Sequence, residues 1–310
     1  MIHIPVLQKE VLQYLDPKPN ENFIDATIDG GGHAAAILGK IKPNGETLGI
    51  EIDPEIYQEL KSKNLDRLIL VNDSYTNLKK IIEKYKFGLV SGILFDLGMS
   101  SWHLEESGRG FSFMRNEPLD MRYQAEIPNS LDPKGTPRRV AFQIPNSNGL
   151  TAERIINTYP REEIERILRE YGEERFSRRI AKKIADERKI KPIKTTFQLV
   201  EIIKKIVPFK KSKIHPATRT FQALRIAVND ELNNLRKILP QTIEVLAPGG
   251  KIVIISFHSL EDRIVKKFLK EEFKKGSLEI LTKKPVRPSK EEIKINSRSR
   301  SAKLRAAMKQ

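Results

Sequence analysis

The residues best suited to hold a cofactor gather at a glycine-rich turn, Asp29-Gly30-Gly31-Gly32-His33. Glycines let a backbone approach a ligand without a Cβ in the way, and a helix that starts behind them favours a negative group. Glu51 follows Gly32 by 19 residues, at the end of the next apolar run. An acid at that spacing accepts hydrogen bonds from ribose hydroxyls. The pattern predicts a site for an adenosine-containing cofactor.

The charges beside the turn indicate which cofactor it is. The glycines do not follow the G-x-G-x-x-G spacing, and the chain has no G-K-[ST] sequence of a P-loop. Asp25 and Asp29 place carboxylates where a pyrophosphate would be repelled. S-adenosylmethionine has no phosphate and carries a sulfonium and an ammonium. The turn therefore favours a methyltransferase over an NAD-dependent oxidoreductase, which stays as an alternative.

Two further residues lie at the expected ends of apolar runs. Asp96 ends the run at 89–95, and an α/β sheet holds its reactive substrate at the carboxyl ends of its strands; the alternative is a helix cap. Tyr75 follows the run at 67–71, where an aromatic ring covers an adenine face or packs in the core.

Alternating strands and helices must position these residues. We expect strands at 23–28, 47–50, 67–71 and 89–95, with helices at 34–38, 55–63 and 77–85. Such βαβ units make a parallel sheet with both faces covered. After a predicted turn at 247–250, the run KIVIISF at 251–257 predicts another buried strand.

The alternation stops after residue 115. Five prolines break residues 116–150, the apolar period is helical over 151–207, and one long helix is expected from Pro216 to Leu239. We therefore predict a discontinuous methyltransferase domain, 1–115 and 216–310, and an inserted helical domain, 116–215, with 124–148 as a loop-like insertion.

Composition limits the partners and the compartment. The chain has no apolar run of the roughly 18–20 residues that span a membrane, and Met1–Pro5 lacks the layout of a secretion signal, so we expect a cytoplasmic protein. The absence of cysteine excludes disulfides and thiolate chemistry. The net charge is +16, and residues 263–310 hold 16 Lys/Arg against 5 Asp/Glu. Clustered cations indicate a nucleic acid partner or a lysine-rich surface of a heat-adapted protein.

Longer motifs resemble one family almost from end to end. They are HIPVL at 3–7, DATIDGGGH at 25–33, ILFDLGMSS at 93–101, GRGFSFM at 108–114, LDMR at 119–122, YGEERFSRRIA at 171–181, HPATRTFQALRIAVNDEL at 215–232 and LAPGGKIVIISFHSLEDRIVK at 246–266. On these stretches the sequence resembles the bacterial 16S ribosomal RNA N4-cytosine methyltransferase family, known as RsmH and formerly as MraW.

The resemblance implies a Rossmann-like, S-adenosylmethionine-dependent methyltransferase sheet that is interrupted by an all-helical RNA-recognition domain. It implies methylation of the exocyclic amine of one cytidine, at position 1402 of 16S rRNA, in the decoding region of the small ribosomal subunit. It implies no metal and no membrane partner, and it leaves a homodimer open.

The cofactor contacts of the family carry over to Gly31, Gly32, His33, Glu51, Tyr75, Asp96 and His103. Three positions depart from its pattern: Asp29 stands where glycine is usual, Glu51 replaces the commoner Asp, and His103 replaces Gln.

The resemblance also implies direct transfer from sulfonium to amine without a covalent enzyme intermediate, which agrees with the lack of cysteine. Ser100 and His258 are the candidates for orienting the target amine. The alternatives are a helix cap at Ser259-x-x-Asp262 and a His258 that only orients a loop.

RNA contacts are expected from two groups of residues. One group combines aromatic and basic side chains: Trp102, Phe111, Phe113, Arg109 and Arg115. Core packing explains its two phenylalanines equally well. The other is a basic stretch in the helical insertion: Arg175, Arg178, Arg179, Lys182 and Lys183.

Two other functions are disfavoured. A DNA N4-cytosine methyltransferase is disfavoured because Leu97-Gly98-Met99 replaces a proline-proline-aromatic motif. A non-catalytic RNA-binding protein would not need the glycine turn.

Overall fold

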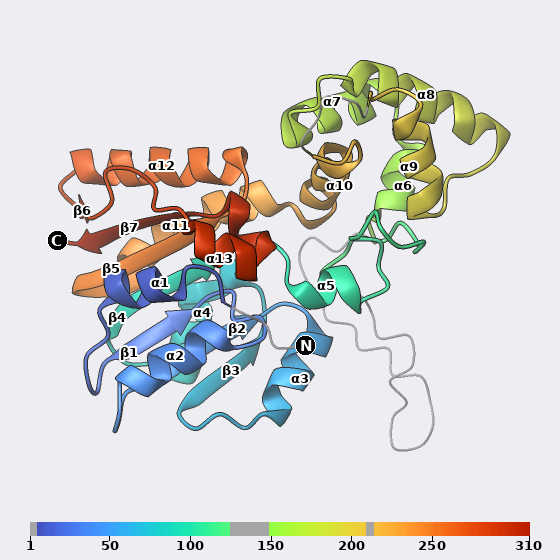
Figure 1. The fold of residues 1–310 in the computed structure, drawn as a ribbon. Coiled ribbons are helices and arrows are strands. Elements are labelled where there is room, and N and C mark those ends of the chain that lie inside the picture. Colours follow the sequence, from blue (N-terminus) through green and yellow to red (C-terminus); the bar gives the residue numbers. More distant parts are fainter. Residues whose placement is uncertain (1–4, 125–148, 209–213) are drawn as a thin grey trace, which may run out of the picture. The chain divides into compact units, whose positions relative to one another are not determined.

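The computed structural model describes residues 5–124, 149–208 and 214–310, drawn in Figure 1. The chain forms two compact units, residues 1–100 with 232–310, and residues 101–231. These units divide the chain after residues 100 and 231, whereas the sequence analysis expected the divisions after residue 115 and before residue 216. The helix that follows residue 216 belongs to the helical unit because it packs tightly there: a Cβ on Gly172 would lie 2.5 Å from the carbonyl oxygen of Arg219.

The first unit, called the sheet unit below, contains a seven-stranded sheet in the order β3-β2-β1-β4-β5-β7-β6. Neighbours from β3 to β5 are parallel, and β7 runs antiparallel to both β5 and β6. The strands are β1 (Asn22–Asp25), β2 (Thr47–Glu51), β3 (Leu68–Asn72), β4 (Val90–Asp96), β5 (Leu246–Ser256), β6 (Leu278–Ile280) and β7 (Lys303–Lys309).

Helices cover both faces of this sheet, as the alternating pattern predicted. On β4, Ile93 and Phe95 belong to the core on one face, with α4, α11 and α12, whereas Leu94 belongs to the core on the other face, with α1 and α2. The helices are α1 (Gln8–Leu15), α2 (Gly32–Lys40), α3 (Pro54–Ser62), α4 (Leu78–Tyr85), α11 (Glu231–Val245), α12 (Ser259–Lys274) and α13 (Lys290–Ile295), with 3-10 turns η1 (Tyr75–Asn77) and η3 (Ser297–Ser301).

The second unit, called the helical unit below, is helical from residue 152 to 204, as predicted. Its helices are α5 (Ser101–Glu105), α6 (Ala152–Thr158), α7 (Arg161–Gly172), α8 (Ser177–Ile190), α9 (Thr196–Lys204) and α10 (Thr218–Asn229). Ile164, Ile167 and Ile180 are among its fully or nearly fully buried residues. Most of the predicted 124–148 insertion lies outside the described residues.

One local prediction is wrong. The single helix expected from Pro216 to Leu239 is two helices, because Asp230 takes a left-handed conformation (φ 50°) that ends α10. The turn expected at 247–250 lies within the bounds of β5, where the register against β4 steps from Val90↔Leu246 to Gly92↔Lys251. Gly249 has φ +76°, and a Cβ on Gly250 would lie 2.8 Å from the carbonyl oxygen of Ala247, so the backbone turns here as predicted.

No helix in the described part of the chain is both long and apolar enough to span a lipid bilayer.

Candidate cofactor site

The carboxyl ends of three neighbouring strands bring the predicted cofactor residues to one edge of the sheet. β1 lies between β2 and β4, with Asp25 aligned to Gly49 on one side and to Leu94 on the other. Backbone hydrogen bonding to β2 continues beyond the end of β1, since the amide of Ile28 donates to the carbonyl of Ile50. Parallel strands end at the same edge, so the turn after β1 meets the ends of β2 and β4.

The glycine turn has the backbone geometry that its composition requires. Asp29 has φ 51° and Gly31 has φ +81°, both in the left-handed region, and α2 then begins at Gly32. No described side chain caps this end of α2, so its first amides are available to a ligand. A Cβ on Gly32 would lie 2.4 Å from Pro5 Cγ, so Gly32 also permits close packing.

Glu51 fixes the turn after β1 to the start of α3. Its buried carboxylate accepts the amide of Asp29 through Oε2 at 3.1 Å and the amide of Asp53 through Oε1 at 2.8 Å. Asp53 in turn caps α3 by accepting the amide of Glu55 at 2.9 Å, at the start of the helix that the sequence predicted over 55–63. Each carboxylate oxygen of Glu51 keeps a second lone pair for a ligand hydroxyl.

His33 and Asp96 face each other beside the turn. His33 Nε2 lies 3.5 Å from Asp96 Oδ2, within ion-pair distance. Both ring nitrogens of His33 and Oδ1 of Asp96 are buried without a hydrogen-bond partner among the described residues. Asp96 is held in place through its amide, which donates to Thr27 Oγ1 at 2.7 Å. Buried polar atoms of this kind call for a partner, so this is where a polar ligand group fits.

The acidic groups at this edge raise one another's pKa values. Burial raises the pKa of Asp25 to about 7. Burial and the Asp96 charge raise the pKa of Asp29, and burial and the Asp29 charge raise that of Glu51. Burial alone would lower the pKa of His33, but the Asp96 carboxylate at ion-pair distance and the nearby carboxylates of Asp25 and Asp29 leave it raised. A cationic ligand would relieve this repulsion.

Tyr75 lies on η1, just beyond β3, as the sequence predicted. Its partly buried ring packs edge-on against Phe95 of β4, with the ring centroids 6.0 Å apart. Ser74, which is buried, caps this turn by accepting the amide of Thr76. Ser74 is not among the residues predicted from the sequence, although a serine directly before a short helical turn indicates a capping residue.

Ser100 contacts the glycine turn of the cofactor site at Asp29. Its buried hydroxyl hydrogen-bonds the Asp29 carboxylate and opposes the rise in the pKa of that group. Thr27, which the sequence analysis did not single out, is a second hydroxyl here. It links the ends of β1 and β4 by donating its amide to Asp25 Oδ1 and accepting the amide of Asp96.

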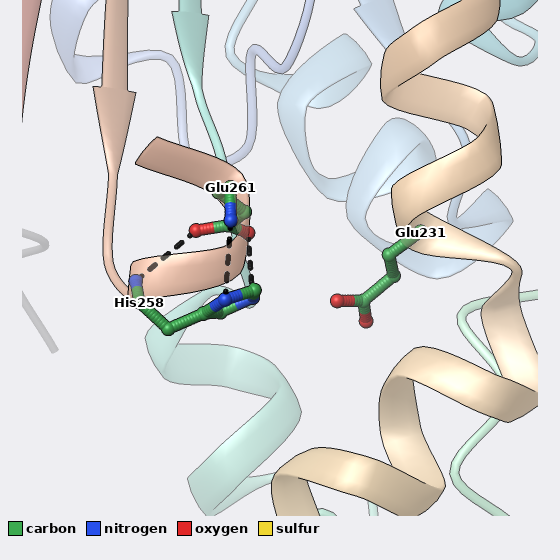
Figure 2. Close-up of side chains that lie close together, drawn as sticks. All are labelled: Glu231, His258 and Glu261. Atoms are coloured by element: carbon green, nitrogen blue, oxygen red, sulfur yellow. Dashed lines mark hydrogen bonds and ion pairs between the residues drawn. The ribbon is translucent and has the colours of Figure 1, made fainter. Parts of the chain in front are cut away.

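His258 is the N-cap residue of α12 (Figure 2), so the cap expected at Ser259-x-x-Asp262 begins one residue earlier. Its Nδ1 accepts the amide of Glu261 at 3.4 Å, while the Glu261 carboxylate accepts the amides of Phe257 and His258. Nε2 of His258 lies 3.1 Å from Glu261 Oε1. Both ring nitrogens thus face Glu261, and this geometry favours a capping role.

His103 lies on α5 of the helical unit, where its buried ring packs edge-on against Trp102, Phe111 and Tyr123. Its predicted cofactor contact stays a prediction. In the same unit Phe111 is buried, which agrees with the core-packing alternative, and Phe113 stacks on His215 with centroids 4.5 Å apart.

Comparisons with known proteins give one family. The model of the MraW methylase family matches residues 1–130 and 140–310. The chain is 43% identical over 328 residues to ribosomal RNA small subunit methyltransferase H of Heliobacterium mobile, covering 99% of this chain and 98% of the relative. It is 44% identical to the protein of that name in Halothermothrix orenii, covering 98% and 97%. The one in Dictyoglomus thermophilum is also 44% identical, covering 98% and 95%. The chain therefore belongs to the MraW methylase family and is a methyltransferase.

Proposed function

We propose that this methyltransferase transfers the methyl group of S-adenosylmethionine to the exocyclic amine of one cytidine in small-subunit rRNA, at position 1402 in the decoding region. The observation that carries the proposal is the set of carboxylates with raised pKa values around the glycine turn, in a chain of a methylase family. Similar proteins carry the name of a small-subunit rRNA methyltransferase, which supports the choice of substrate.

The residues at the strand ends fit S-adenosylmethionine group by group. Glu51 has free lone pairs for the ribose hydroxyls, and Tyr75 offers a partly exposed ring beside Phe95 for the adenine. The first amides of α2 suit the methionine carboxylate. Asp29 and Asp96 are anionic partners for the ammonium and sulfonium. When bound, the cofactor supplies an electrophilic methyl group.

The remaining task of the chain is to hold the target amine. Its lone pair is delocalised into the cytosine ring, so the amine must be held pyramidal, about 3–3.5 Å from the methyl carbon. A hydrogen-bond acceptor on the amine does this. Ser100 is the favoured candidate because its buried hydroxyl hydrogen-bonds Asp29 at the cofactor turn, and a hydroxyl can both donate and accept. His258 stays the second candidate, although its ring nitrogens face Glu261.

The helical unit presents cations for the RNA backbone. Arg175, Arg178, Arg179 and Lys182 are exposed at the start of α8, whereas Lys183 is partly buried and pairs with Glu187 at 2.9 Å. Exposed cations on one helix bind phosphates with little dependence on base sequence. We propose that this stretch holds rRNA, in the small subunit or as free RNA, while the base leaves its stack to reach the methyl group.

The deciding experiment is mass spectrometry of small-subunit rRNA after incubation with the protein and a methyl-labelled donor. The proposal expects one labelled cytidine, with the label on the exocyclic nitrogen. Label on ring carbon 5, on another nucleotide or on no nucleotide would refute it. An Asp96→Asn variant is the matched control, since it removes one charge at the cofactor site.

A further inference from the structure

The sheet unit carries a concentration of cations that neither its fold nor the cofactor site uses. Residues 283–300, called the basic segment below, contain seven Lys and Arg and two acids, Glu291 and Glu292. All seven cations are exposed: Lys283, Lys284, Arg287, Lys290, Lys294, Arg298 and Arg300. Such a density of like charge on 18 residues destabilises the fold through self-repulsion, which a bound polyanion would relieve.

Ion pairs distinguish these cations from their neighbours. Elsewhere in the last part of the chain, Lys275 pairs with Glu272 at 2.6 Å, and Arg305 with Asp262 at 2.7 Å. Within the described residues, six cations of the basic segment form no ion pair: Lys283, Lys284, Arg287, Lys290, Lys294 and Arg300. The Oε1 atom of the nearby acid Glu292 accepts the amide of Leu7 at 2.7 Å, which ties this carboxylate to the start of α1.

The backbone of the basic segment is fixed. Val286 and Leu304 exchange backbone hydrogen bonds of 2.9 Å, Ser289 caps α13 by accepting the amide of Glu292, and Ser299 is fully buried. Cations on a fixed backbone lose less conformational entropy on binding than those on a loose tail. This arrangement suits a partner of regular charge spacing, such as a nucleic acid backbone.

The basic segment also borders the cofactor turn, and both lie in the sheet unit. Glu292 of α13 holds Leu7, and next to Leu7 the side chain of Gln8 donates to the carbonyl of Gly32 at 3.2 Å. Figure 1 draws α13 toward the end of the sheet to which the β1 arrow points. An RNA whose base reaches the cofactor therefore has its flanking phosphates near these cations.

We propose that the basic segment binds the phosphates of the substrate RNA and is a second RNA surface, separate from the stretch at the start of α8. The choice of RNA as the partner rests on the proposed function. The surface contacts phosphates only, so it contributes affinity and positioning without reading bases.

The test measures binding of a fluorescent RNA hairpin from the decoding region to the full chain over a range of NaCl concentrations. One variant carries Lys283→Gln, Lys284→Gln and Arg287→Gln. The matched control removes the same charge from α3 and α4, at the other edge of the sheet, through Lys61→Gln, Lys80→Gln and Lys84→Gln, which are all exposed. Thermal midpoints and S-adenosylmethionine affinity of both variants check that folding and the cofactor site are intact.

We expect the basic-segment variant to lose roughly 2 units of the slope of log K against log [NaCl], and the control to lose far less. An unchanged slope, or an equal loss in both variants, would overturn the inference. Since binding is measured without methyl transfer, a wild-type protein that binds this RNA but leaves it unmethylated refutes the proposed function alone. Wild-type protein that binds neither the hairpin nor the assembled small subunit refutes both.

Discussion

His33 Nε2 and Asp96 Oδ2 lie 3.5 Å apart, although the two strands that position them, β1 and β4, are separated by some 60 positions in the sequence. His33 is buried and Asp96 is partly buried, and each has polar atoms without a hydrogen-bond partner in the described structure. The carboxylate of Asp96 thus raises the pKa of the imidazole, and both groups keep polar atoms that a ligand can contact.

An Asp96→Asn variant should lower the pKa of His33 below that in the wild type, because the raising interaction is lost and burial then dominates. NMR titration of ring-labelled histidine measures this, since the chain has five histidines. Asp66→Asn, at a highly exposed carboxylate, is the matched control. A His33 pKa that does not move would contradict the assignment of the pair.

The preference for S-adenosylmethionine over neutral S-adenosylhomocysteine should grow as the pH rises from about 6 to 9. Asp25 titrates at about 7 and the pKa of Asp29 is raised as well, so both become anionic in this range and attract the sulfonium. Calorimetric titration of both ligands at several pH values gives the ratio of the two Kd values. A ratio independent of pH would exclude these carboxylates as partners of the sulfonium.

The ligand-free protein should lose stability as the pH rises from 3.8 to about 7. The pKa of Asp25 is raised in the folded state from its usual 3.8, so its contribution is fully present below 3.8 and is lost as the pH rises through about 7. Asp29 and Glu51 act in the same direction. Denaturant titrations between pH 5 and 8 measure the effect, and an Asp25→Asn variant should flatten it.

Asp29→Gly should stabilise the ligand-free protein by about 0.5–1 kcal/mol. A residue other than glycine in the left-handed region costs about 1–2 kcal/mol, and the added flexibility of glycine in the unfolded chain offsets part of this gain. The φ of 51° at Asp29 is the reason for the expectation. Asp29→Asn, which removes the charge at the same φ, separates backbone strain from electrostatics. Equal denaturation midpoints for the wild type, Asp29→Gly and Asp29→Asn would contradict backbone strain at this position.

Ser100→Ala should lower kcat about tenfold or more at saturating S-adenosylmethionine, because the amine loses its acceptor. His258→Ala should cost about 1 kcal/mol of stability through the loss of the α12 cap, and His258→Asn should restore most of it. Single-turnover methylation and chemical denaturation measure the two effects. Full turnover in both alanine variants would end the proposal that either residue orients the amine.

Reversal of three charges on α8, through Arg178→Glu, Arg179→Glu and Lys182→Glu, should weaken RNA binding and lower the salt slope by about 1 per lost phosphate contact. Lys61→Glu, Lys80→Glu and Lys84→Glu make the matched control. Binding of the α8 variant equal to that of the control would exclude the helix as an RNA surface.

The cofactor edge of the sheet was predictable because local patterns determine it. Apolar runs gave β1 to β4, and glycines and acids at the strand ends marked the turn, Glu51 and Asp96. What depends on long-range packing was not predictable: β7 between β5 and β6, the end of α10 at Asp230, and the pairing of His33 with Asp96. The cap at His258 was placed one residue late because serine is the commoner cap residue.

The pairing of β4 with β5 has a consequence for synthesis of the protein. These neighbouring strands are separated in sequence by the whole helical unit, residues 101–231. A nascent chain that has emerged only through residue 231 holds every helix of that unit, whereas β4 still has an unpaired edge. Exposed strand edges recruit other chains, so the growing polypeptide passes through an interval in which chaperone protection of β4 matters most.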